Sequence, residues 1–467
     1  MRTPRTLRAD RPGGVADNQP SPDPRMPMFR FPAALLGAAL ALSGCGSLPA
    51  GTAAPITTAH PALAREAEAP LVLISIDGFR NDYLERGRTP VLSALARDGV
   101  RARYMRPSYP SITFPNHYTL VTGLRPDHHG VIANFMTDPT IPGVRFSMFD
   151  PATTGDARWW EGGTPLWSSV REQGGRAATM FWVGSEAPVH GARPEFWRPF
   201  DGRVGSEQRV RQVLDWLALP ATERPHLVTL YFDRVDSMGH QYGPDSAELD
   251  DALREVDTAI GHLREGIQAL RLGQRTNLVV VSDHGMAATG PERELFLDDL
   301  VDVSRLDFTW TGAYAAFDAL PGGEPAARQL LGRHAHMDCM RRGQIPARFA
   351  YGRHRRVPAY ICMGEHGWQV TTRREMLRSG HRLHGEHGYD NLDPDMRAPF
   401  IAHGPAFGQG VVIPPIDNVD VYPLLARVLG ITPAANDGDA AHTAAALRSR
   451  PARPPRRSRA APQGDDR

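Results

Sequence analysis

The sequence is poor in cysteine, has no excess of charge of either sign, and has no apolar run long enough to span a bilayer. Its three cysteines are Cys45, Cys339 and Cys362, and none of them falls in the ligand pattern described below. With 53 basic and 52 acidic residues the formal net charge is +1, so charge gives no reason to expect nucleic acid as a specific partner. The apolar run at 31–42 is shorter than the ~20 residues that a membrane helix needs.

What the sequence does contain is a set of acidic residues at the ends of apolar runs. Asp77 directly follows the run Leu71–Ile76, and Asp283 and His284 closely follow Asn277–Val281. Both runs have the length and composition of buried strands. Because open α/β sheets hold their ligands at the carboxyl ends of strands, these three side chains are candidate metal ligands.

A second set of candidates follows a third strand-like run, at 227–232. Asp236 and His240 come after it, and their spacing of four residues places both side chains on one face if the segment is helical. The last candidate, His387, lies far downstream, before the apolar segment 399–402. The two ligand groups would then be Asp77, Asp283 and His284, and Asp236, His240 and His387.

Carboxylate and imidazole ligands without a thiolate suit catalytic zinc better than manganese or iron. Two such ions about 4 Å apart can hold the attacking and leaving oxygens of an in-line displacement at phosphorus. Thr113, in the segment 110–117, is then a candidate nucleophile. Taken singly, Asp77 and Asn134 could be turn residues and Thr113 could cap a helix. The joint pattern favours the metal site.

The order of the elements predicts the fold class. Strand-like runs alternate with helical patterns, such as one that opens at Pro90 and ends by Gly99, and a longer one from after Asp245 to about Leu272. This alternation predicts an α/β fold with a largely parallel sheet covered by helices on both faces. Residues 286–385 mix short apolar runs with basic stretches, and we expect them to form a small cap-like insertion.

Five short motifs occur in a distinctive order. They are IDGFR at 76–80, TFPNHY at 113–118, DSMGH at 236–240, SDHGM at 282–286 and HGYDN at 387–391. In order and spacing these motifs resemble those of the nucleotide pyrophosphatase/phosphodiesterase family of the alkaline phosphatase superfamily. The resemblance covers about residues 68 to 432. The resemblance implies an alkaline-phosphatase-like catalytic domain at 68–432. It assigns one zinc to Asp77, Thr113, Asp283 and His284, and the other to Asp236, His240 and His387.

The resemblance also implies a mechanism. Thr113 would attack phosphorus and form a covalent phospho-threonine ester, which water then cleaves. Metal coordination would lower the pKa of the threonine hydroxyl, so no neighbouring base is needed. The amide of Asn134 and the backbone N–H of the nucleophile turn would meet the charge that develops on the phosphoryl oxygens. Phe114 and Phe200 would stack on a nucleobase, although either ring could instead be ordinary core.

A phosphodiester carries one negative charge fewer than a monoester, so its site needs no additional arginine or third metal. We therefore expect hydrolysis of nucleoside triphosphates, dinucleotide polyphosphates or similar small molecules to nucleoside monophosphates. One alternative is a phosphodiesterase for choline-type lipid head groups, which would need an aromatic and acidic cage. The other is a non-enzymatic lipoprotein binding module, against which the complete ligand set and Thr113 argue.

The N-terminal region resembles a bacterial lipoprotein signal. Arginines precede the apolar run at 31–42, and LSGC at 42–45 resembles a lipobox. Residues 1–45 would be the signal region, with translation starting at Met26 or Met28 as an alternative. Cleavage before Cys45 and lipidation of its thiol would anchor the protein to a membrane facing the bacterial periplasm, and we expect the outer rather than the inner membrane. An uncleaved anchor or ordinary secretion is the alternative.

Three further expectations concern the rest of the chain. Residues 46–67 would form a flexible linker. In an exported protein Cys339 and Cys362 could pair, or could stay two buried thiols. Residues 433–467 would be a disordered basic tail, because the arginines from 448 to 459 lie among proline, alanine and serine, a composition that cannot bury a core. The sequence does not indicate an oligomeric state.

Overall fold

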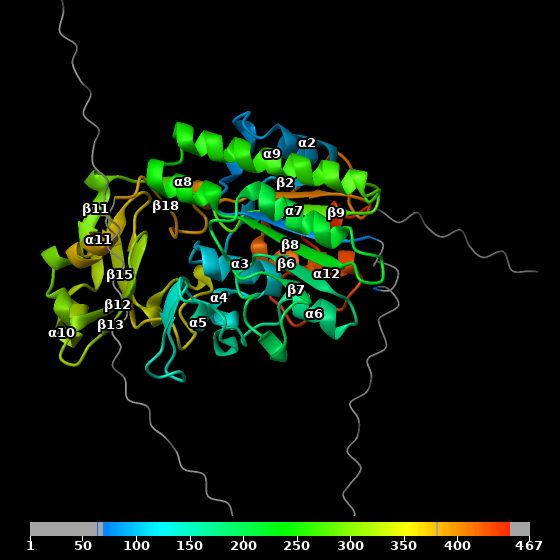
Figure 1. Ribbon diagram of the computed structural model, residues 1–467. Helices are drawn as coiled ribbons and strands as arrows, with labels where there is room; N and C mark the ends of the chain where they lie inside the picture. The colour runs from blue at the N-terminus through cyan, green and yellow to red at the C-terminus, as the bar shows by residue number, and fades with distance from the viewer. Residues whose placement is uncertain (1–62, 64–68, 380–381, 449–467) are drawn as a thin grey trace, which may run out of the picture. The chain divides into compact units, whose positions relative to one another are not determined.

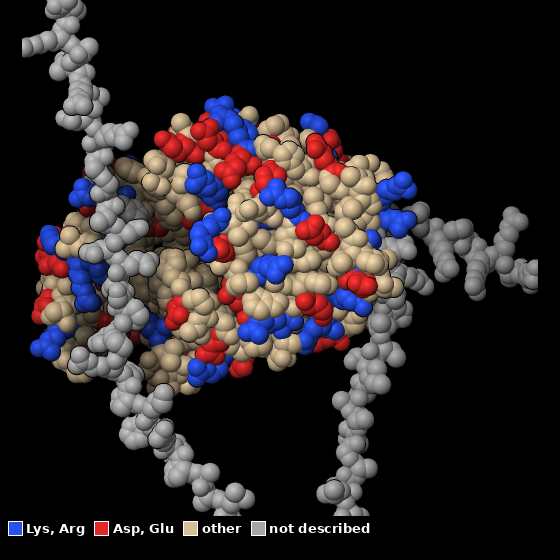
Figure 2. All heavy atoms as spheres, viewed as in Figure 1, with Lys and Arg blue, Asp and Glu red and all other residues tan. Residues whose placement is uncertain are grey.

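The computed structural model describes residue 63 and residues 69–379 and 382–448, all within one compact unit. The signal region at 1–45, with its two alternative start sites and Cys45, lies outside the described residues. Among the helices that are described, none has both the length and the apolar character needed to cross a membrane. On the face shown in Figure 2, basic and acidic side chains are intermixed, as the balanced composition predicts.

In the described part of the chain the largest sheet has eight strands, in the order β20-β2-β19-β9-β1-β8-β6-β7 (Figure 1). Adjacent strands run parallel from β9 to β7, while β19 is antiparallel to both β9 and β2. The predicted largely parallel sheet is therefore confirmed, with β19 as an antiparallel exception. The strands are β1 (Leu71–Ile76), β2 (Val100–Ala102), β6 (Ala177–Met180), β7 (Phe196–Trp197), β8 (Leu227–Phe232), β9 (Asn277–Val281), β19 (Phe400–His403) and β20 (Val411–Ile413).

Helices cover both faces of this sheet, as predicted (Figure 1). Alternate residues of β1 face opposite ways, so Val72 packs into one apolar cluster and Leu73 into the other. The first cluster includes residues of α2 (Pro90–Asp98), α7 (Ser206–Leu217), α8 (Arg234–Tyr242) and α9 (Ala247–Ala269). The second includes residues of α3 (Thr113–Thr122), α6 (Leu166–Glu172) and α12 (Val421–Leu429).

The two helices predicted from local signals are present. Helix α2 has Pro90 as its first residue and ends before Gly99. Helix α9 begins after Ser246, whose hydroxyl accepts a hydrogen bond from the backbone N–H of Leu249. A capping side chain of this kind satisfies one of the N–H groups that a helix leaves free at its start.

A second sheet lies inside the range 286–385, where we expect an insertion. It is antiparallel throughout, in the order β12-β13-β16-β15-β14, and buries its own apolar cluster. Its strands are β12 (Leu306–Trp310), β13 (Tyr314–Ala319), β14 (Gly332–His334), β15 (Met337–Arg341) and β16 (Tyr360–Gly364). Between β15 and β16 the chain returns to the main domain, where Phe349, Tyr351 and Val357 join the core around α3. We call residues 345–357 the inserted arm.

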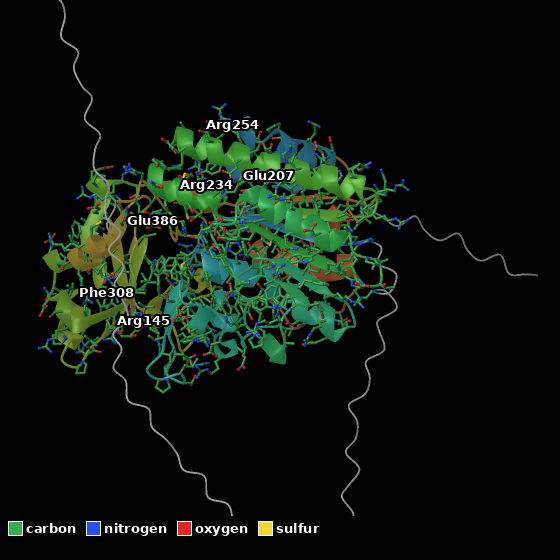
Figure 3. The ribbon with its side chains drawn as sticks, viewed as in Figure 1. Arg145, Glu207, Arg234, Arg254, Phe308 and Glu386 are labelled. Atoms are coloured by element: carbon green, nitrogen blue, oxygen red, sulfur yellow. A yellow bond between two sulfur atoms is a disulfide. The ribbon has the colours of Figure 1, made fainter. Side chains whose placement is uncertain are left out.

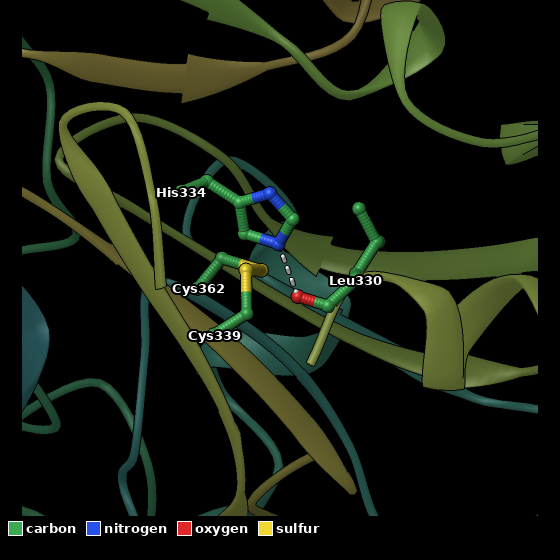
Figure 4. Close-up of a disulfide and its surroundings, with 4 residues drawn as sticks. All are labelled: Leu330, His334, Cys339 and Cys362. Carbon is green, nitrogen blue, oxygen red and sulfur yellow. Dashed lines mark hydrogen bonds between the residues drawn. A yellow bond between two sulfur atoms is a disulfide. The ribbon is translucent and has the colours of Figure 1, made fainter. Parts of the chain in front are cut away.

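Cys339 and Cys362 are bonded to each other in the structure (Figure 4). They lie directly opposite each other on the antiparallel strands β15 and β16. Both side chains are buried in the apolar cluster of the second sheet. The bond therefore fixes the pairing of two neighbouring strands within the insertion.

Two predicted boundaries are wrong. Leu63, the one described residue of the predicted linker 46–67, is buried, and its carbonyl accepts a hydrogen bond from His226. The predicted tail does not begin at residue 433, because the chain packs on the domain as far as 448. Within this segment Leu447 forms an isolated β-bridge with Phe407, and the side chain of Asp437 accepts a hydrogen bond from the backbone N–H of Arg125. Long-range contacts of this kind leave no periodic pattern in the sequence.

Replacing both Cys339 and Cys362 by serine should lower the free energy of unfolding. The bond joins residues 23 apart in sequence, and closing a loop of that length stabilises a fold by about 3 kcal/mol. Urea denaturation followed by near-ultraviolet circular dichroism measures the change, and reduced wild-type protein is the matched control. Alkylation of both thiols in denatured but unreduced wild-type protein would contradict the bond.

Candidate metal centre

Three neighbouring strands bring five of the predicted ligands to one edge of the main sheet. Strands β9, β1 and β8 are adjacent and parallel, so their carboxyl ends lie together. Asp77 follows β1, and Asp283 and His284 follow β9. Helix α8, which begins soon after β8, carries Asp236 and His240 one turn apart on one face.

The sixth ligand, His387, reaches the same place through a short strand pair. It follows β18 (Gly385–Glu386), which pairs antiparallel with β10 (Ala287–Ala288). Because β10 comes three residues after His284, this pairing places the two imidazoles side by side. Their rings stack with centroids 3.6 Å apart.

The first predicted group is assembled in the structure. His284 Nε2 lies 2.9 Å from Asp283 Oδ2 and 3.5 Å from Asp77 Oδ1. The predicted nucleophile Thr113 is the first residue of α3, and its Oγ1 lies 3.4 Å from the same imidazole nitrogen. All four side chains are buried.

The second predicted group is assembled beside the first. His240 Nε2 and His387 Nε2 lie 3.0 Å apart, and each is 3.5 Å from Asp236 Oδ1. Ligand atoms of Asp236, His284 and His387 lie within 4.8 Å of one another, so His284 stands between the two groups. The structure therefore brings all seven predicted residues together.

The donor set fits divalent cations. Three carboxylate oxygens, Asp77 Oδ1, Asp236 Oδ1 and Asp283 Oδ2, are buried without a hydrogen-bond partner among the described residues. Burial and the charges of Asp283 and Asp236 raise the pKa of Asp77 well above its usual range. Burial also raises the pKa of Asp236, although His240 and His284 oppose it. Cations would supply both the missing partners and the missing positive charge.

All three imidazoles of the cluster have the same orientation relative to the ligand atoms. Each lies with Nδ1 within hydrogen-bond distance of a backbone carbonyl, so that Nε2 faces the cluster. The carbonyls are Gly385 O for His240 at 2.9 Å, Gly285 O for His284 at 2.9 Å and Ser111 O for His387 at 3.0 Å. When Nδ1 carries the donated proton, Nε2 has a free lone pair for a cation.

Sequence analysis missed several residues that contact the ligands. The hydroxyl of Ser282 donates to Asp283 Oδ1 at 3.3 Å, and Glu386 offers a carboxylate oxygen within 4.8 Å of ligand atoms of His240 and His387. The hydroxyl of Tyr231 donates to Asp77 Oδ2 at 2.6 Å. His117 Nδ1 lies 3.3 Å from Asp283 Oδ2 and 3.0 Å from the carbonyl of Thr113. His117 is four residues after Thr113, so helical spacing could have indicated it, whereas Tyr231 sits on β8 with no local signal.

Asn134 lies against the start of α3. Its Oδ1 accepts a hydrogen bond of 2.9 Å from the backbone N–H of Phe114, the residue after Thr113. That N–H is therefore already engaged, in contrast to the expectation that the nucleophile turn offers it to substrate. The amide nitrogen of Asn134 is the group left to act as a donor.

A single buried guanidinium holds both ends of the loop that carries Asn134. Arg356, on the inserted arm, donates to the carbonyl of Gly130 at 2.8 Å and to Asp138 at 2.5 Å. Burial disfavours the charge on Asp138, but Arg355 and Arg356 outweigh it and hold its pKa well below the usual range. The insertion therefore helps to position Asn134.

The two predicted stacking rings lie in different surroundings. Phe114 is partly buried and packs on Phe146, with centroids 5.9 Å apart. Phe200 is 50% exposed and lies 6.0 Å from the ring of Tyr231, whose hydroxyl bonds Asp77. Among the described residues no ring contact joins Phe114 to Phe200.

Comparison with known proteins identifies the family of the chain. Residues 71–390 match the family model of type I phosphodiesterase / nucleotide pyrophosphatase. An uncharacterised pyrophosphatase/phosphodiesterase of Schizosaccharomyces pombe is 36% identical over 394 residues, covering 79% of each chain. The chain belongs to this family, within the alkaline phosphatase superfamily.

Animal relatives match the same portion of the chain. Human ectonucleotide pyrophosphatase/phosphodiesterase family member 1 is 35% identical, and the match covers 79% of this chain but only 41% of that protein. The solved structure of murine ectonucleotide pyrophosphatase/phosphodiesterase 5 is 30% identical, with a TM-score of 0.77 over 81% of this chain and 100% of that one. An inactive threonine-to-alanine variant of it has been solved in complex with AMP.

Replacing Asp236 by asparagine should lower the divalent metal bound per purified chain to about half, because it weakens only one of the two ligand groups. Elemental analysis by mass spectrometry, normalised to protein concentration, measures the change. Asp251→Asn is the matched control, since the Asp251 side chain is 78% exposed on α9. Wild-type protein without bound transition metal would contradict the assignment.

Proposed function

We propose that this protein is a zinc-dependent phosphodiesterase that hydrolyses phosphodiester or pyrophosphate bonds of nucleotides to nucleoside monophosphates. The observation that carries the proposal is the hydroxyl of Thr113 beside a largely buried cluster that contains three aspartates and three histidines. The family to which the chain belongs and the AMP complex of a relative support it.

The chemistry needs a nucleophile, a place for negative charge and a leaving group. Two Zn²⁺ ions held by the two ligand groups would lower the pKa of the nucleophile and bind phosphoryl oxygens. The bond from Thr113 Oγ1 to phosphorus forms as the bond to the leaving oxygen breaks, which gives a phospho-threonine ester. Water then cleaves this ester and restores the hydroxyl.

The position of Thr113 favours this step. It is the first residue of α3, so negative charge beside its side chain meets the positive end of the helix. The amide nitrogen of Asn134 is fixed next to it, because the amide oxygen is held by the N–H of Phe114. A fixed donor of this kind stabilises charge that develops on the phosphoryl group.

Phe114 and Phe200 are proposed to hold the nucleobase. Phe114 directly follows the nucleophile, and Phe200 is exposed next to Tyr231 and Asp77. The two rings could stack on any nucleobase, because every base has a flat π face. Cleavage of choline-type lipid head groups is not favoured, because the names of the matched family and of the human relative refer to nucleotide pyrophosphatases.

Replacing Thr113 by alanine should lower the turnover of p-nitrophenyl thymidine monophosphate by about 10³-fold or more, because no other hydroxyl replaces the nucleophile. The bound metal should stay, since the carboxylates and imidazoles are unchanged. Steady-state kinetics and elemental analysis on the same preparations measure both quantities.

Thr113→Ser keeps a hydroxyl at this position and serves as the matched control, with activity retained. Full activity of Thr113→Ala would exclude the phospho-threonine route. Equal wild-type turnover of p-nitrophenyl phosphate would contradict the preference for diesters. Faster turnover of p-nitrophenyl phosphorylcholine would favour the lipid head-group alternative.

We also propose that the chain is exported and anchored by lipid on Cys45, which lies outside the described residues. The apolar run at 31–42 and the LSGC segment that ends at Cys45 support this. Cys45→Ser should abolish incorporation of labelled palmitate and move the protein from the membrane fraction to the soluble one. Unchanged labelling and fractionation would contradict it.

A further inference from the structure

The segment from Gly130 to Asp138 carries Asn134 at its centre, four residues from either end. The inserted arm contacts both ends through one side chain. Arg356 Nη1 donates to the carbonyl of Gly130, and Arg356 Nε donates to Asp138. Because a guanidinium is planar and rigid, its bonds to these two acceptors fix the distance between the ends of the segment.

The guanidinium of Arg356 is fully engaged on the main domain. Besides the two bonds just described, it donates to the carbonyl of Trp159 at 2.9 Å and to that of Arg158 at 3.0 Å. Its side chain is only 4% exposed. Arginine can serve four acceptors at fixed angles, since it has five N–H donors in a planar fork, whereas lysine has three donors on a flexible stem.

The neighbouring residue Arg355 pairs with the same carboxylate but not with the rest of the segment. It donates to Asp138 at 2.9 and 2.8 Å, and its side chain is 50% exposed. Among the described residues no hydrogen bond joins Arg355 to Gly130. When Arg356 alone is replaced, the charge of Asp138 therefore remains paired. The two arginines separate the role of this charge from the role of the contact with Gly130.

The inserted arm has attachments to the main domain that do not involve Arg356. The carboxylate of Asp127 accepts hydrogen bonds of 2.8 to 3.1 Å from three consecutive backbone N–H groups of the arm, those of Gly352, Arg353 and His354. Bonds from the backbone do not depend on the side chain at position 356. We therefore expect the arm to stay docked when the guanidinium is removed.

The chain that follows Asn134 is also fixed independently of Arg356. It forms β4 (Phe135–Thr137), which pairs with β5 (Arg145–Ser147). Arg145 of this hairpin donates to the backbone carbonyl of Phe308 in β12. Figure 3 shows Arg145 and Phe308 together at this junction. Loss of the Arg356 side chain should therefore leave the hairpin in place and loosen the stretch from Gly130 to Asn134.

The position of Asn134 matters because its amide nitrogen is the donor proposed for the phosphoryl group. Its amide oxygen is already held by the N–H of Phe114, so the nitrogen can reach substrate only if the segment keeps its path. Loss of a donor of this kind lowers kcat by about 10²- to 10³-fold. A displacement of about 1 Å alone can cost about 10²-fold.

We propose that Arg356 is a positioning residue for the reaction, which acts through Asn134 and raises kcat without taking part in substrate binding. This inference rests on the proposed function. The hydrogen bonds of Arg356 go to Gly130, Asp138, Trp159 and Arg158, none of which is a predicted metal ligand. A side chain of the insertion thus supports the reaction without contacting the reacting atoms.

A double-mutant cycle with p-nitrophenyl thymidine monophosphate tests this role. Arg356→Met should lower kcat by about 10- to 100-fold, while KM stays within about twofold of the wild-type value. Asn134→Ala should lower kcat by about 10²- to 10³-fold. In the Asn134→Ala background, Arg356→Met should lower kcat by less than about a further twofold, because the donor through which it acts is already gone.

Arg355→Met is the matched control, because it removes an ion pair with the same Asp138 but no contact with Gly130, and it should leave kcat unchanged. Arg356→Lys is a second variant that keeps the positive charge and should show the same pattern as Arg356→Met. Elemental analysis and thermal unfolding of the same preparations should show unchanged bound metal and a folded protein.

A loss of kcat that is equally large with and without Asn134 would overturn the inference, as would an equal loss in Arg355→Met or an unchanged kcat in both Arg356 variants. Failure of both Arg356 variants to fold would assign the residue to stability and would overturn it too. In each of these cases active wild-type protein leaves the proposed function intact. Wild-type protein that does not cleave the diester would overturn the proposed function, and the inference with it.

Discussion

The constraint on which the rest of the structure depends is the mutual repulsion of three neighbouring carboxylates, two of them fully buried and the third largely so. Asp77, Asp236 and Asp283 lie close together because the strands that deliver them are adjacent. Each has an oxygen with no hydrogen-bond partner among the described residues, although imidazole nitrogens lie within 3.5 Å of it. Such an arrangement is costly without positive charge nearby. The three imidazoles around it supply lone pairs, and their Nδ1 contacts with backbone carbonyls keep those lone pairs directed inward.

Sequence predicted most of the ligand cluster because its signals are local. Asp77 follows an apolar run that becomes a buried strand, and Asp236 and His240 have helical spacing on α8. His387 has no such signal of its own and was placed by a motif that resembles a known family. Its position depends on the pairing of β10 with β18, two strands of two residues each that no propensity would indicate.

What sequence could not predict depends on contacts between distant segments. Arg356 holds the Asn134 loop across more than two hundred residues. The rings of Phe135 and Trp310, 6.0 Å apart, come from segments far apart in the sequence. The departures from the predicted boundaries have the same cause, since Leu63 and Leu447 contact segments far away in the sequence and follow no repeating pattern.

The inserted arm has a consequence for how relatives of this protein diverge. Residues 345–357 leave the second sheet, enter the main core and contact the loop beside the nucleophile, through Tyr351 at Ile132 and Arg356 at Gly130. The insertion is therefore not a separable module. A relative or chimera in which the insertion changes without the 130–138 segment would lose these contacts beside the reaction centre.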